Sequence, residues 1–207
     1  KQYGLVSEAG FLAGHKQCFP FESGLSGFFT AGCCQGPMDM AGAARSAAGA
    51  AGKVLQLLSR RVELNPYIPV IEKARCDKCK RCIEECPYGV MFLDEEGFPG
   101  LDPAYCRGCQ VCMGACARRC LTTQGFNIRQ MIAMVTAKIK EPAPGEPTIL
   151  AFMCENDAYR AVIQGVRQGV TFPPNIHIIP VRCLGTCNAV LIQDALPLGV
   201  DGFVFAG

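Results

Sequence analysis

Two short runs of cysteine constrain the fold of this 207-residue chain more than any other feature. Each run places four cysteines within eleven residues, with gaps of two, two and three residues between them. The first run is Cys76, Cys79, Cys82 and Cys86, and the second is Cys106, Cys109, Cys112 and Cys116. Three thiolates at this spacing lie on one tight loop and the fourth lies on the helical turn that follows, so each run can ligate a metal cluster.

Repeated in this way, the spacing resembles the pattern of bacterial ferredoxins that hold two 4Fe-4S clusters. In that pattern the first three cysteines of a run wrap one cluster, while the fourth reaches across to the other. The predicted ligand sets are Cys76, Cys79, Cys82 with Cys116, and Cys106, Cys109, Cys112 with Cys86. The exchange places the two clusters close together, so an electron can pass between them without a mobile carrier.

The second run departs from the first after its last cysteine. Pro87 follows Cys86, whereas Ala117 follows Cys116 and a further cysteine, Cys120, comes three residues later. Cys120 is either a spare thiol or an alternative ligand, and we interpret it as a spare thiol.

Structural zinc and a disulfide framework are the alternatives for these cysteines. Zinc sites usually take paired Cys-x-x-Cys knuckles separated by a long spacer, and an odd total of 15 cysteines argues against a purely disulfide-bonded scaffold.

Cationic residues surround the runs. They either stabilise a reduced anionic cluster and steer an acidic partner, or form an ordinary solvated face. These cations are Lys78, Lys80, Arg81, Arg107, Arg118 and Arg119.

The composition of the chain excludes several classes of function. Half of the residues are hydrophobic, and the formal net charge of +2 gives no broad preference for nucleic acid or an anionic membrane. Nothing resembles a secretory signal, and the longest apolar stretch, 40–58, is interrupted by Arg45 and Lys53. No Ser/His/Asp or Cys/His arrangement points to hydrolysis, so no catalytic residue is assigned. We predict a cytoplasmic protein that reaches a membrane only through partner subunits.

The segment before the runs is rich in glycine and alanine, and its pattern predicts a strand over 27–31, a turn over 32–37 and a helix over 40–58. This order resembles the closing motif of flavoproteins with two dinucleotide-binding domains, in which a helix N-terminus faces the flavin. The Gly-x-Gly-x-x-Gly fingerprint for the FAD pyrophosphate is absent, so either the chain is truncated or another segment completes the site, and we expect a fragment of a longer protein with an incomplete FAD site. The FAD contacts that the resemblance implies are Gly32, Cys33, Asp39 and Met40, with Cys33 standing where aspartate is usual.

The Ala-Gly-Cys-Cys-Gln-Gly-Pro-Met-Asp stretch, the alanine-rich helix and the two cysteine runs together resemble the C-terminal part of the flavin subunit of heterodisulfide reductase. Beyond a helix over 127–140 and three prolines within 141–147, the sequence predicts strands and helices in βαβαβ order, which favours a small parallel sheet. These elements are a strand over 149–154, a helix over 157–168, a strand over 176–183, a helix over 189–196 and a strand over 202–205. This segment resembles the delta subunit of methyl-viologen-reducing hydrogenase. The fusion of the two is most similar to the B subunit of the quinone-interacting membrane-bound oxidoreductase.

Three cysteines of the last segment, Cys154, Cys183 and Cys187, follow strands at the edge where open α/β sheets place their sites. The resemblance implies that they could supply three ligands to a 2Fe-2S cluster, but Asp157 stands where the delta subunits have another cysteine. We therefore predict that this segment binds no cluster as it stands and docks a neighbouring redox subunit. His177, on an alternating apolar strand, is interpreted as a packed residue.

The predicted fold class is α+β, with a two-cluster ferredoxin-like domain between the end of a flavoprotein dinucleotide-binding domain and a small parallel α/β domain. The predicted domains are residues 1–66, the end of the FAD-binding domain; 67–125, the ferredoxin domain; 126–147, a helix and linker; and 148–207, the delta-subunit-like domain. The function predicted is electron relay between a flavin and partner redox subunits, by a protein that is not self-sufficient. The alternatives are a docking module with structural clusters and a part of a heterodisulfide reductase.

Overall fold

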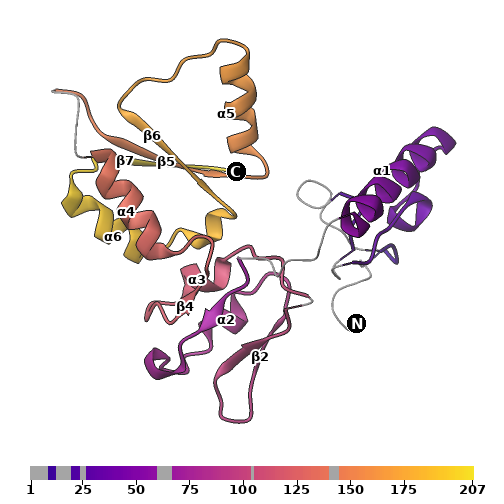
Figure 1. Cartoon of the computed structure of the whole chain (residues 1–207), viewed down its shortest axis with the longest axis horizontal. Helices are drawn as coiled ribbons and strands as arrows, with labels where there is room; N and C mark the ends of the chain where they lie inside the picture. The colour runs from indigo at the N-terminus through magenta and orange to yellow at the C-terminus, as the bar shows by residue number, and fades with distance from the viewer. Residues whose placement is uncertain (1–8, 13–19, 24–26, 60–66, 104, 140–144) are drawn as a thin grey trace. The chain divides into compact units, whose positions relative to one another are not determined.

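The computed structural model describes residues 9–12, 20–23, 27–59, 67–103, 105–139 and 145–207 (Figure 1). The chain divides into two compact units. The first comprises residues 1–65, 88–90 and 101–107, and the second comprises residues 66–87, 91–100 and 108–207. Across the described residues, helices are mixed with small two- and three-stranded sheets. None of the helices in these ranges is both long and apolar enough to cross a membrane.

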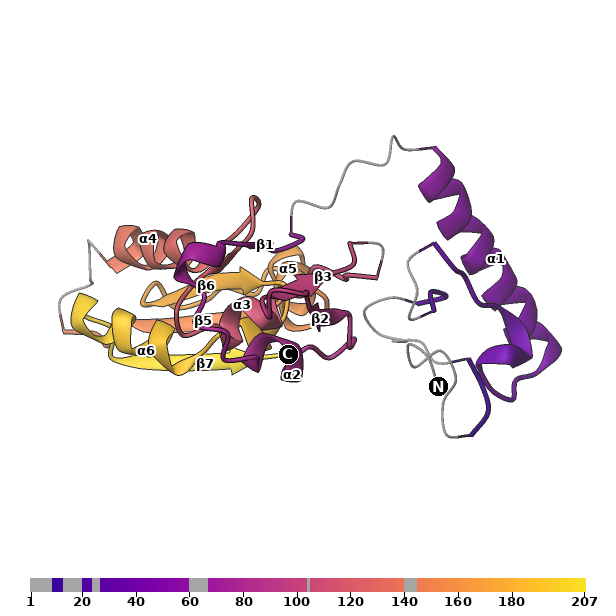
Figure 2. The same cartoon turned by 90° about the horizontal axis from the view of Figure 1, so that it is seen from below.

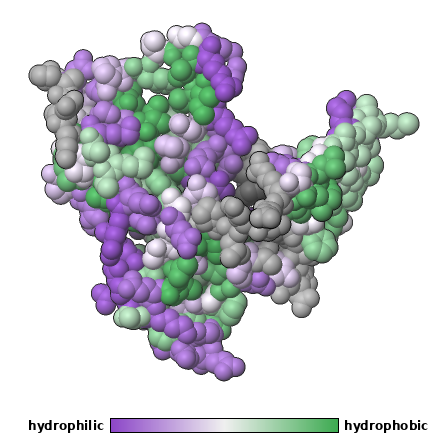
Figure 3. Space-filling model, viewed as in Figure 1, coloured by the Kyte–Doolittle hydropathy of each residue, from purple (hydrophilic) through white to green (hydrophobic). Residues whose placement is uncertain are grey.

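The first unit is built on helix α1, Met40–Leu58, which has the bounds that the sequence predicts. Alanine favours helix, and the Asp39 carboxylate caps its N-terminus by accepting a hydrogen bond from the Gly42 amide at 2.6 Å. Before it lies a 3-10 helix, Gly32–Gln35. Apolar residues near the C-terminal end of α1 are exposed, and the helix is largely green in Figure 3.

The predicted strand over 27–31 is wrong, because only an isolated antiparallel bridge between Glu22 and Phe29 forms there. Gly27 has a φ of +82°, outside the extended region, so the segment turns instead of continuing as a strand. Hydrogen bonds from the Ser23 amide to the Phe28 carbonyl and from the Thr30 amide to the Phe21 carbonyl flank the bridge.

The segment with the cysteine runs has the same local structure twice. Helix α2, Arg81–Glu84, includes the third cysteine of the first run, and α3, Val111–Ala115, holds the corresponding place in the second. Strand β1, Val70–Ile71, pairs antiparallel with β4, Leu121–Thr122, and a 3-10 helix, Lys73–Arg75, leads into the first run. Strands β2, Met91–Leu93, and β3, Pro99–Leu101, pair as a hairpin between the two runs.

Left-handed backbone recurs at matching places in the two runs. Lys78 and Gly108 have φ values of 59° and 61°, and Lys80 and Gln110 have values of 64° and 66°. Gly89 and Arg119, three residues after the fourth cysteines, have values of 60° and 51°. Because the residue types at these positions differ, the shared conformation belongs to the loop itself, and it confirms the internal repeat.

The C-terminal domain is a parallel three-stranded sheet in the order β6-β5-β7. Its strands are β5, Ile149–Cys154, β6, Ile176–Val181, and β7, Gly202–Ala206. Its helices are α5, Ala158–Arg167, and α6, Ala189–Ala195, with 3-10 turns at Leu184–Thr186 and Leu196–Leu198. The predicted βαβαβ order is confirmed, although β6 ends two residues before the predicted bound.

Helices cover both faces of this sheet. Helix α4, Ile128–Ile139, lies beside α6 in Figure 1 and in Figure 2, and α5 lies on the other side of the strands. Met131 and Val135 of α4 and Phe152 of the central strand are fully buried. This core fixes the carboxyl ends of β5 and β6, where two of the predicted site cysteines lie.

Candidate metal centres

Four cysteines from both runs lie near one another in the second unit. Cys82 is buried at α2, and burial raises its pKa to about 11, with further increases from Cys116, Cys79 and Cys76. These three neighbours, with Cys82, are the members of the first predicted ligand set. The structure therefore brings Cys116 of the second run to the cysteines of the first, as crossed ligation requires.

The chemistry of this group fits an iron-sulfur cluster. It consists of thiols, the soft ligands that favour Fe-S clusters. Among the described residues, no three His, Cys, Asp or Glu side chains converge as closely as a single metal ion needs.

Cys120 lies beside this group. Its sulfur is 3.2 Å from Cys116 Sγ, and its backbone amide nitrogen is 3.4 Å from the same sulfur. Burial, followed by contact with Cys116 and Cys76, raises the pKa of the Cys120 thiol. Sequence reasoning noted Cys120 but did not anticipate how closely it approaches the fourth ligand.

The members of the second predicted set are each at least half-buried within their own unit. Cys112 is buried, and Cys86, Cys106 and Cys109 are half-buried. Cys106 belongs to the first unit, whereas the other three belong to the second. Between Cys109 and Cys112, Gln110 is 1% exposed, and its amide nitrogen donates to Thr123 Oγ1 at 2.9 Å and to the Phe126 carbonyl at 2.6 Å.

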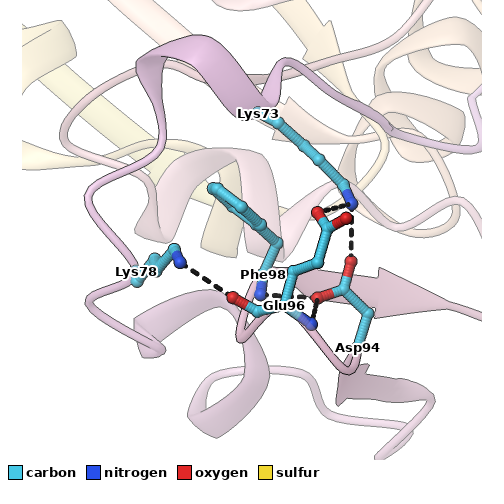
Figure 4. A network of polar contacts seen from close by, with 5 residues as sticks. All are labelled: Lys73, Lys78, Asp94, Glu96 and Phe98. Atoms are coloured by element: carbon cyan, nitrogen blue, oxygen red, sulfur yellow. Dashed lines mark hydrogen bonds and ion pairs between the residues drawn. The ribbon is translucent and has the colours of Figure 1, made fainter.

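The turn of the β2–β3 hairpin supports the loop of the first run (Figure 4). Lys78 Nζ, between two predicted ligands, donates to the Glu96 carbonyl at 2.8 Å and lies 4.1 Å from the centre of the Phe98 ring. Lys73 forms ion pairs with Asp94 at 2.7 Å and Glu96 at 2.9 Å. These pairs raise the pKa of Lys73 and lower that of Asp94.

A turn of the C-terminal domain supports the loop of the second run. The 3-10 turn Leu184–Thr186 packs on α3, and a Cβ added to Gly114 would clash with the Gly185 carbonyl oxygen. Thr186 is fully buried, and its hydroxyl donates to the Cys109 carbonyl at 3.3 Å. Asn188 Nδ2 donates to the Gly114 carbonyl at 2.6 Å. The close approach of the turn backbone requires glycine at position 114, whereas Gly185 faces the Val111 side chain.

Most of the predicted basic residues have partners. Lys78 bonds to the hairpin, Arg107 pairs with Glu22 at 2.7 Å inside the first unit, and Arg119 pairs with Asp194. Arg118 lies 3.7 Å from Asp77. Lys80 and Arg81 are exposed beside the first run.

The predicted flavin contacts lie around the N-terminus of α1. Gly32 has a φ of +70° and donates its amide to Ser46 Oγ at 3.1 Å, and Cys33 is exposed. Met40 is 91% exposed. The Gly42 amide already donates a hydrogen bond to the Asp39 carboxylate. A capping anion at this helix end opposes the accumulation of electron density that the flavoprotein resemblance implies, so this arrangement does not fit a flavin carbonyl at the same amide.

The three C-terminal cysteines lie at one edge of the sheet. Cys154 ends β5, and Cys183 follows β6, its strand neighbour. Burial and the nearby Cys183 raise the pKa of Cys187 to about 12. Asp157 occupies the N-cap position of α5. His177 is paired with Leu150 at the other end of β6, and burial lowers its pKa, as expected for a packed histidine.

Comparison with known proteins identifies relatives of these segments. Residues 149–207 match the family described as methyl-viologen-reducing hydrogenase, delta subunit, and residues 68–91 match a 4Fe-4S binding domain. In Methanosarcina mazei, the A subunit of ferredoxin:CoB-CoM heterodisulfide reductase is 28% identical over 199 residues, which are 95% of this chain and 25% of that protein. In Methanothermobacter marburgensis, the A subunit of H(2):CoB-CoM heterodisulfide,ferredoxin reductase is 35% identical over 143 residues, 68% of this chain and 22% of that protein.

A third relative matches a shorter part of the chain. Pyruvate synthase subunit PorD of Methanocaldococcus jannaschii is 37% identical over 56 residues, which are 27% of this chain and 65% of that protein. The chain spans about a quarter of the length of the two heterodisulfide reductase subunits. It is a region like the C-terminal part of the heterodisulfide reductase A subunit, with a 4Fe-4S binding domain and a hydrogenase delta-subunit domain. Both predicted resemblances are thereby confirmed, and the closer likeness to the quinone-interacting B subunit stays a prediction.

Proposed function

We propose that this chain is an electron-transfer segment of a multisubunit oxidoreductase and that it holds two 4Fe-4S clusters. The observation that carries the proposal is the proximity of Cys82 to Cys76, Cys79 and Cys116. Two consecutive runs with crossed ligation need this proximity, and a single-run site does not. The similarity to the A subunits of heterodisulfide reductases supports a redox role.

When bound, such clusters supply one-electron transfer. The residues of the chain hold and orient the ligands: the hairpin turn fixes Lys78 in the first loop, and Thr186 fixes the Cys109 carbonyl in the second. The second loop also excludes water, because Gln110 and Met113 are almost fully buried.

The finer proposal concerns partners. Other redox subunits of a heterodisulfide-reductase-like, hydrogenase-like or quinone-interacting complex would exchange electrons with this chain, and any membrane contact would come through them. An FAD shared with a longer protein would lie near Gly32, Cys33, Asp39 and Met40. The Asp39 carboxylate accepts a hydrogen bond from the Gly42 amide, so the flavin would not bond to that amide, and we expect the 207 residues alone to bind FAD weakly.

The decisive experiment is cluster analysis of anaerobically purified protein. We expect about eight iron atoms and about eight acid-labile sulfides per chain. Cys34→Ala is the matched control, since Cys34 is exposed and outside both sets, and this variant should keep all of its iron. Zinc without sulfide would refute the proposal. Clusters that fail to cycle in a redox titration at physiological potentials would instead favour the docking module with structural clusters.

A further inference from the structure

Cys120 is a buried thiol that belongs to neither predicted ligand set. It is 3% exposed, and its sulfur lies 3.2 Å from the sulfur of Cys116, the fourth predicted ligand of the first set. Its side chain also interacts with Cys76, another member of that set. Cys120 therefore contacts the sulfur of one of the four cysteines that would hold this cluster and lies near a second.

The backbone fixes Cys120 in this place. The Glu72 amide donates to the Cys120 carbonyl at 2.8 Å, next to the pairing of β1 with β4. The Cys120 amide nitrogen, 3.4 Å from Cys116 Sγ, points at the same sulfur as its thiol. The thiol and the backbone amide of Cys120 thus both lie against the sulfur of Cys116.

The first run has no equivalent thiol. Cys120 comes four residues after Cys116, and the residue four after Cys86 is Val90. The two predicted clusters therefore differ in the hydrogen bonds available to their crossing ligands.

We propose that Cys120 is a positioning residue that donates its S–H to the sulfur of Cys116 and raises the reduction potential of that cluster alone. An iron-bound cysteine sulfur can only accept, so the thiol beside it donates. Hydrogen bonds to ligand sulfurs stabilise the more electron-rich reduced state and are one of the factors that set cluster potentials. The inference rests on the proposed function, because it needs a cluster at the first set.

The test is a redox titration of the 207-residue chain, followed by paramagnetic resonance, with iron and sulfide measured on each sample. In Cys120→Ala, one of the two potentials should become more negative while the other stays unchanged, and the iron content should stay at the wild-type value. Cys120→Ser keeps a hydroxyl donor and should shift the same potential less. Cys34→Ala, which removes an exposed thiol outside both sets, should shift neither.

Unchanged potentials in Cys120→Ala, or equal shifts of both, would overturn the inference. If Cys120→Ala lost half of its iron while Cys116→Ala kept it all, Cys120 would be the ligand and the assignment would be wrong. If Cys120→Ala failed to fold, Cys120→Val and Cys120→Ser would decide the matter, since only the serine keeps a donor. A wild-type chain without clusters would refute the proposed function instead.

Discussion

The loop of the first cysteine run lies at the surface of its unit, whereas the second run, from residue 108 onward, is largely enclosed. Cys79, Lys80 and Arg81 are exposed, while Gln110 and Met113, at the corresponding part of the second run, are buried. Charged side chains of a hairpin turn support the first loop. Backbone atoms and the Thr186 hydroxyl of the turn Leu184–Thr186 support the second.

The same ligand loop can therefore take two different roles, depending on the segments that pack against it. An exposed loop with cations at its surface suits exchange with an external acidic partner, since such charges accelerate encounter. A loop covered by the delta-subunit-like domain is less accessible to an external partner. Cys183 and Cys187 flank the covering turn, which places them on the side of the second run.

The largest expected effect tests crossed ligation between the runs. Cys79→Ser and Cys116→Ser should each remove the same cluster, about four iron atoms, although they lie in different runs. Cys109→Ser should remove the other cluster and leave the first signal. Paramagnetic resonance of the reduced proteins distinguishes these outcomes. Matching spectra for Cys116→Ser and Cys109→Ser would break the predicted crossing.

The second largest effect is a difference in stability between substitutions at matching positions of α2 and α3. Gly114→Ala places a methyl group against the Gly185 and Thr186 carbonyl oxygens, and we expect it to lower the free energy of unfolding by about 1–3 kcal/mol. The matched control is Glu84→Ala at the exposed position of the first run, with an effect within about 0.5 kcal/mol. Urea denaturation of the cluster-loaded proteins measures both. Equal losses would mean that the second run is no more enclosed than the first.

A smaller contrast concerns the left-handed position shared by Gly108 and Lys78. Gly108→Ala should lower the free energy of unfolding by about 1–2 kcal/mol, because a side chain at φ 61° is strained. Lys78→Gly should relieve that strain but lose the bond to Glu96, so its net change should stay within about 1 kcal/mol. The two denaturation midpoints are compared under one condition. A large loss in Lys78→Gly would show that the hairpin contact outweighs the backbone.

The smallest expected effect is the pH dependence of the hairpin network. Lys73 and the backbone amides of Phe98 and Glu96 lower the pKa of Asp94, so its contribution to stability is present above about pH 3.9, its unfolded value. This contribution is lost as pH falls through the lower folded pKa. The denaturation midpoints of wild type and Asp94→Asn should therefore differ at neutral pH and converge in strong acid. A gap that widens on acidification would contradict the sign.

Regular patterns made part of this fold predictable. The alanine-rich run gave the bounds of α1, and the apolar run of β5 gave that strand residue for residue. The strand over 27–31 failed because Gly27 turns the chain before a ladder can form. For the candidate site, the spacing predicted which cysteines approach Cys82.

The enclosure of the second run could not be predicted. It depends on Gly114 meeting Gly185, two residues far apart in sequence whose contact involves backbone atoms and leaves no hydrophobic period. The partners of the basic residues could not be predicted either, because an ion pair such as Arg119 with Asp194 depends on where the fold places both side chains.

The recurring left-handed residues link the proteolytic stability of the protein in a cell to the binding of its clusters. Four of the six matching positions carry side chains there: Lys78, Lys80, Gln110 and Arg119. Each costs roughly 1–2 kcal/mol, which metal–thiolate bonds can offset because cluster binding and folding are coupled. A chain starved of iron would relax these loops and offer Lys78 and Lys80 to proteases that cut after basic residues. The rate of its proteolytic turnover would then follow the supply of iron and sulfide.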